Sequence, residues 1–127
     1  MPEKHLYEYA VIRLVPRVER EEFINVGIIL FCKRARFIQA RCHLDEEKLR
    51  IIAPDTEPAA WHAHLRVFDT ICSGAPEGGP IARLDMAERF RWLTAVRSAS
   101  VQTSRPHPGL TDDLEETFER LFRELVL

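Results

Sequence analysis

The chain has 127 residues, an apolar fraction of 46%, a charged fraction of 30% and a formal net charge of −2. These values predict one globular domain over residues 1–127, and they argue against wholesale binding to nucleic acid or to an anionic membrane. No apolar run approaches the roughly 20 residues that cross a bilayer. Because residues 1–5 hold no long apolar segment of the signal-peptide type, we expect a cytoplasmic protein whose three cysteines are thiols.

Three apolar runs with strand character open the chain, at Leu6–Val15, Phe23–Lys33 and Phe37–Leu44. The links between them are short and charged, which favours an antiparallel meander, because parallel strands need a longer crossover. The first run is apolar on both faces, so we expect a central strand. The third alternates, and its polar residues, including Arg41, are predicted to face outward.

Helical patterns follow, and we expect helices capped by Asp45, Thr56, Asp85 and Thr111. Residues 74–80 and 104–109 are predicted to be loops because they are rich in glycine and proline. Residues 98–103 predict a short fourth strand. Strands that precede helices favour an α+β fold. We therefore expect an antiparallel sheet of three to four strands, an N-terminal meander, with helices packed on one face.

Two parts of the chain are similar to one known family. Residues 9–13 (Tyr-Ala-Val-Ile-Arg) and 22–31 (Glu-Phe-Ile-Asn-Val-Gly-Ile-Ile-Leu-Phe) resemble the first half of the bacterial domain of unknown function 3037 family. Residues 89–98, Gln102, Ser104, the Gly-Leu-Thr of residues 109–111 and the final helix resemble its second half. The resemblance implies a small bacterial cytoplasmic protein with no assigned activity. It also points to a protein partner, because some family members are encoded beside kinase-like proteins related to persistence toxins.

Arg13 and Asn25 form the most notable polar pair in the predicted sheet. A hairpin centred near Glu19 places them opposite one another on neighbouring strands. A guanidinium beside an amide is suited to binding a carboxylate or a phosphate. The alternative is a structural pair that satisfies polar groups at the strand ends, which is the more common role of such residues.

A second polar group comprises Arg97, Gln102, Ser104 and Arg105. Its functional interpretation is an anion or peptide site on a loop, where binding residues concentrate. Its structural interpretation is a helix-end charge followed by turn-forming serines, and turn preferences favour this alternative. With Arg13 and Asn25, these four residues are the candidate binding residues of the chain.

The sequence contains no familiar catalytic or metal-binding spacing. It has no Cys-x-x-Cys or His-x-x-x-His pair, no Gly-x-Ser-x-Gly elbow and no phosphate-binding loop, so we predict neither a metal nor a cofactor. The favoured hypothesis is a non-catalytic module that binds another protein, without nucleic-acid or membrane partners. The alternative is a small-anion-binding protein or an enzyme built around Arg13, Asn25 and residues 97–105.

Overall fold

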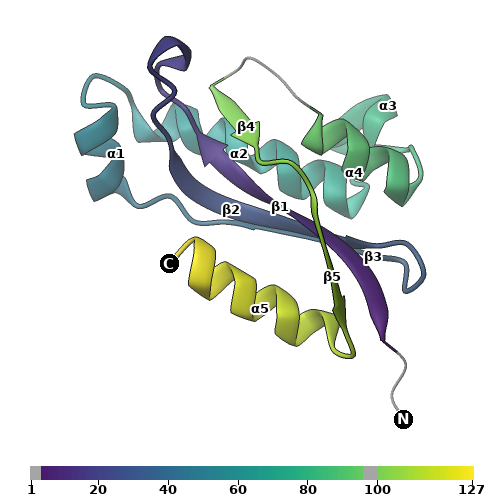
Figure 1. Cartoon of the computed structure of the whole chain (residues 1–127). Coiled ribbons are helices and arrows are strands. Elements are labelled where there is room, and N and C mark those ends of the chain that lie inside the picture. Colours follow the sequence, from purple (N-terminus) through teal and green to yellow (C-terminus); the bar gives the residue numbers. More distant parts are fainter. Residues whose placement is uncertain (1–3, 96–99) are drawn as a thin grey trace.

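A computed structural model describes residues 4–95 and 100–127, and its centre is a five-stranded antiparallel sheet (Figure 1). The strand order is β3-β2-β1-β4, and β5 also pairs with β1. The strands are β1 (His5–Leu14), β2 (Ile24–Cys32), β3 (Phe37–Cys42), β4 (Val101–Thr103) and β5 (His107–Thr111). The predicted antiparallel meander of the first three strands is confirmed, and β1 is central as expected.

β4 and β5 pair with the same edge of β1, on either side of a short break. Ser104 bridges this break, because its backbone N–H donates to the carbonyl of Val11 at 2.8 Å. Its side-chain Oγ accepts the Val11 N–H at 2.9 Å. The predicted loop over residues 104–109 is therefore wrong for residues 107–109. Pro108 has no N–H to donate, which an edge strand tolerates.

Four helices lie on one face of the sheet (Figure 1). They are α1 (Glu46–Ile52), α2 (Pro58–Ser73), α3 (Gly79–Ala82) and α4 (Met86–Thr94). Short 3-10 turns occupy Val18–Arg20 and Pro76–Gly78. The turn at Pro76–Gly78 and the start of α3 fall within residues 74–80, which were predicted to be a loop. The core of this layer combines apolar side chains of β1 and β2 with those of the helices, including Ile12, Ile29, Phe31, Leu49, Trp61, Leu65, Phe68, Phe90 and Leu93.

The last helix, α5 (Leu114–Leu125), covers the opposite face (Figure 1). The expected packing of helices on one face therefore describes α1 to α4, and α5 adds a second layer. The reason is that β1 and β2 carry apolar side chains on both faces. The second core holds Tyr7, Ile28, Leu30, Cys32, Leu114, Phe118, Leu121, Phe122 and Val126.

Arg41 of β3 points away from the first core, as the alternation predicted, and its side chain is 37% exposed at the edge of this second layer. It donates two hydrogen bonds to the Glu119 carboxylate, at 2.7 and 2.8 Å, and its guanidinium lies over the rings of Phe118 and Phe122. These contacts fix α5 against the sheet.

Helix caps follow the expected chemistry with two corrections. Asp45 and Asp85 accept backbone N–H groups of α1 and α4, as predicted. Asp113, and not Thr111, caps α5. Glu57 precedes α2, while the hydroxyl of the predicted cap Thr56 accepts a hydrogen bond from the indole of Trp61. In the described ranges, none of the helices is long and apolar enough to cross a membrane.

Candidate functional site: a polar row at one end of the sheet

Three polar side chains form a row across three adjacent strands. Arg13 of β1 pairs with Asn25 of β2 on one side and with Gln102 of β4 on the other. The predicted Arg13–Asn25 pairing is confirmed, and the register adds Gln102 to it. Directly opposed residues of antiparallel strands have Cβ atoms roughly 4.5–5.5 Å apart, so the three side chains are neighbours.

Arg13 lies in the interior of the sheet with an unusual set of contacts. Its guanidinium carbon lies 4.3 Å from the centroid of the Phe23 ring, a cation–π contact. Within the described part of the chain, the guanidinium makes no hydrogen bond or ion pair, and its Nε is buried without an acceptor. No carboxylate of the described residues therefore forms an ion pair with this guanidinium.

Asn25 reaches the row because β2 contains a bulge. Ile12 pairs with Gly27 while Arg13 pairs with Asn25, so Val26 has no partner on β1. The amide nitrogen of Asn25 then donates to the backbone carbonyl of Leu125, at the end of α5, at 3.1 Å. The amide oxygen is buried without a donor among the described residues. The helix end thus anchors half of this amide and leaves the other half unpaired.

These groups lie on the α5-side face of the sheet, next to the C-terminal end of α5. Phe23 precedes Asn25 by two residues and is 45% exposed, although its ring contacts Arg13. We call Phe23, Arg13, Asn25 and Gln102 the Arg13 platform. Phe23 is not among the residues predicted from the sequence, although residues two apart in a strand point to the same face and the spacing to Asn25 indicates it.

The other candidate residues do not join the platform equally. Ser104 is buried, and its hydroxyl is used in the β1 contact and in a hydrogen bond to the Arg105 carbonyl at 3.1 Å. This favours the structural interpretation of Ser104. Arg105 is exposed in the break between β4 and β5. Arg97 lies outside the described residues.

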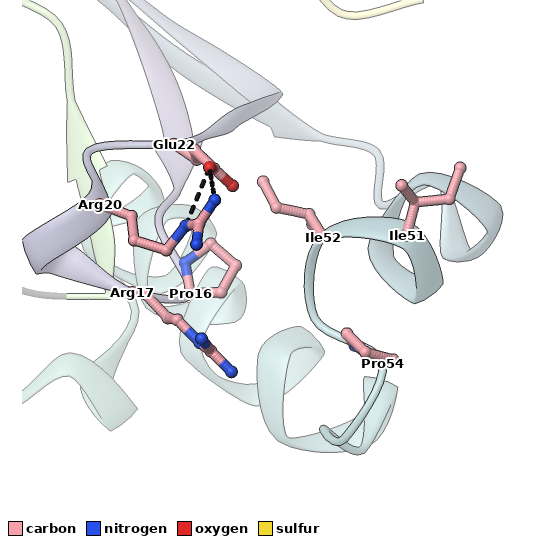
Figure 2. A pocket seen from close by; sticks show the side chains of 7 residues that line it. All are labelled: Pro16, Arg17, Arg20, Glu22, Ile51, Ile52 and Pro54. Atoms are coloured by element: carbon pink, nitrogen blue, oxygen red, sulfur yellow. Dashed lines mark hydrogen bonds and ion pairs between the residues drawn. The ribbon is translucent and has the colours of Figure 1, made fainter.

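A separate concavity lies beside the connection between β1 and β2 (Figure 2). It is lined by Pro16, Arg17, Arg20 and Glu22 from the connection and by Ile51, Ile52 and Pro54 from α1 and the turn after it. The sequence analysis did not identify it, because α1 and the connection are distant in sequence and no pattern places them side by side.

The buried arginine of α4 has a structural role. Arg89 Nη1 donates to the carbonyls of Ile71 and Cys72, at 3.0 and 2.9 Å, near the end of α2. A cation at a helix C-terminus also interacts favourably with the helix dipole. These contacts satisfy Nη1 of the buried Arg89, while its Nε is buried without an acceptor among the described residues.

The cysteines and histidines were two further candidates for chemistry. Across residues 4–95 and 100–127, no group of three or more histidine, cysteine or acidic side chains is arranged to hold a metal ion. Burial raises the pKa of Cys42 and of Cys72 to about 12, and the nearby Asp69 carboxylate adds to both shifts. These thiols are poor nucleophiles at neutral pH, because the thiolate is the reactive form.

Fold and site together define a small α+β protein with a sheet covered on both faces and a cationic polar row at one end. The chain belongs to the family described as "Protein of unknown function (DUF3037)", whose model matches residues 9–126. This confirms the family resemblance noted in the sequence. Searches of curated proteins and of solved structures gave no match.

Proposed function

We propose that this protein is a small cytoplasmic interaction module of bacteria, without catalytic activity, that binds another protein through the Arg13 platform. The observation that carries the proposal is the guanidinium of Arg13, which has no hydrogen-bond or ion-pair partner in the described ranges and lies beside the exposed ring of Phe23. Arginine and aromatic side chains are the residues that most often dominate binding energy at protein interfaces.

The chemistry of the platform favours a partner that presents a carboxylate. An arginine binds a carboxylate through two parallel hydrogen bonds, and bonds to charged groups contribute about 1.5–3 kcal/mol each. Phe23 supplies apolar area next to that anchor. The kinase-like proteins implied by the family resemblance are the first partners to test, with an aspartate or glutamate side chain as the group received by Arg13.

The test is the affinity of the purified protein for the product of a neighbouring gene, measured by isothermal titration calorimetry. We expect Arg13→Met and Phe23→Ser each to weaken binding at least tenfold, which corresponds to about 1.4 kcal/mol. Leu6→Ser is the matched control, because Leu6 is 63% exposed near the other end of β1. The proposal is contradicted if no binding is detected at micromolar concentrations. It is also contradicted if the wild type and Arg13→Met bind with equal affinity.

A small-anion site at the same row is the second candidate, and the alignment of Asn25, Arg13 and Gln102 favours it. Melting in phosphate or sulfate tests it, since a ligand that binds the native state raises Tm. A bound anion should raise the Tm of the wild type more than that of Arg13→Met. Equal shifts for the two proteins count against this alternative.

A further inference from the structure

The concavity in Figure 2 combines apolar walls with an unneutralised cation. Four of its seven lining residues are apolar: Pro16, Ile51, Ile52 and Pro54. Ile51 is 85% exposed, the largest exposed fraction among the large apolar side chains of the described residues. An aliphatic side chain left in water at the rim of a pocket is a contact surface for an apolar group.

The charges of the residues that line the pocket do not cancel. Arg20 donates from Nε and Nη2 to Oε1 of Glu22, so this pair neutralises itself (Figure 2). Arg17 makes no hydrogen bond or ion pair within the described part of the chain. It is exposed, and Figure 2 shows its side chain extending from the connection along the pocket. The pocket therefore carries one net positive charge, at Arg17.

The size of the pocket restricts what it takes. Its volume is about 230 Å³, below the roughly 300–1,000 Å³ of pockets that enclose a drug-sized ligand. It corresponds to roughly seven or eight water molecules at about 30 Å³ each. An aliphatic group and a carboxylate inside this volume must therefore lie close together. The C-terminal residue of a polypeptide meets this condition, because its side chain and its carboxylate share one Cα atom.

We propose that this pocket binds the C-terminal residue of a partner polypeptide, an aliphatic residue such as leucine. Its side chain packs on Ile51 and Ile52, and its carboxylate pairs with the guanidinium of Arg17. The inference goes beyond the proposed function, since the pocket is distinct from the Arg13 platform and its test uses no partner protein. Either proposal can therefore fail without the other.

The test is an NMR titration of the ¹⁵N-labelled protein with acetyl-Gly-Gly-Leu as the free acid. We expect amide shifts confined to residues 17–22 and 50–53, since Pro16 and Pro54 have no N–H. The C-terminal amide of the same peptide removes the charge, and acetyl-Gly-Gly-Gly removes the aliphatic side chain. We expect each of these two peptides to bind at least about tenfold more weakly than acetyl-Gly-Gly-Leu does. Arg17→Met and Ile51→Ser should have the same effect on the leucine peptide.

Arg83→Met is the matched control, because Arg83 is an exposed arginine at the end of α3 and does not line the pocket. Arg17 and Ile51 are both exposed, so their variants should retain the dispersed spectrum of a folded protein. The proposal is overturned if the free acid and the C-terminal amide of the peptide bind with equal affinity. It is also overturned if Arg17→Met binds acetyl-Gly-Gly-Leu as tightly as the wild type does, or if the amide shifts are centred on other residues. Isocaproate, a free branched carboxylate, should bind more weakly than the peptide, and equal affinity would reject a polypeptide end as the ligand.

Discussion

Replacing Phe118 with alanine should destabilise the protein strongly, because this ring is the centre of the layer between α5 and the sheet. Phe118 is 1% exposed and packs within the second core, and the guanidinium of Arg41 lies 5.0 Å from its ring centroid. Truncation removes the buried ring and leaves a cavity that the surrounding side chains fill only in part. Such changes cost about 3–5 kcal/mol.

This loss is large relative to the stability of a small protein, which is about 5–15 kcal/mol. With about 2.1 cal/mol/K of unfolding entropy per residue, 3–5 kcal/mol lowers the Tm of a 127-residue chain by roughly 10–20 °C. Urea denaturation followed by circular dichroism measures the free energy, and the midpoint should fall with little change in slope.

Phe23→Ala is the control, because it removes the same ring from a position that is 45% exposed. Its cost should be about 1 kcal/mol, from partial burial and from the cation–π contact with Arg13. If Phe118→Ala melts within a degree or two of the wild type, α5 does not form a core with the sheet, and the reasoning fails.

Three further outcomes are expected. Gly27→Val should lower stability even though valine favours strands, because a Cβ at this position would lie 2.6 Å from the carbonyl oxygen of Arg41; unchanged urea unfolding would refute the clash. Burial raises the pKa of Cys42 and of Cys72 to about 12, so above about pH 9 the folded state keeps protons that the unfolded state loses. The free energy of unfolding should therefore fall as the pH rises above about 9. Replacing both cysteines with alanine should weaken this pH dependence. Arg89→Met should cost about 1–3 kcal/mol, because it removes the donor to two carbonyls near the end of α2, and a melt at the wild-type Tm would show that water replaces it.

The sheet was predictable because its strands carry their pattern locally. The first three runs alternate or are apolar throughout, and their links are too short for anything but antiparallel neighbours. β5 was not predictable in this way. Pro108 and Gly109 are typical of a turn, yet an edge position tolerates the missing N–H of Pro108. The ring of Tyr7 lies so close to Gly109 that an added Cβ would be 2.4 Å from it, so only tertiary contact explains a glycine here.

The second helical layer shows the limit of pattern analysis. The stripe of α5 indicated a buried face, and β1 and β2 indicated apolar side chains on both faces of the sheet. Neither observation alone says which face α5 covers. In the structure Arg41 of β3 is paired with Glu119 of α5, two residues far apart in sequence that are each typical of an exposed position. The candidate site shows the same difference between local and long-range contacts. Local hairpin geometry predicted the Arg13–Asn25 pair, whereas the pairing of Arg13 with Gln102 joins strands that are far apart in sequence.

The bulge at Val26 is the feature that makes the polar row compatible with the core. Along an uninterrupted strand, Asn25 would point to the same face as Ile29 and Phe31, which pack against α1 to α4. An amide without a partner in that layer would cost about 1–3 kcal/mol. One extra residue reverses the alternation, so that Asn25 points to the opposite face, where it reaches Arg13 and the end of α5. The bulge therefore turns Asn25 away from the layer of α1 to α4 and places it beside Arg13, next to the C-terminal end of α5.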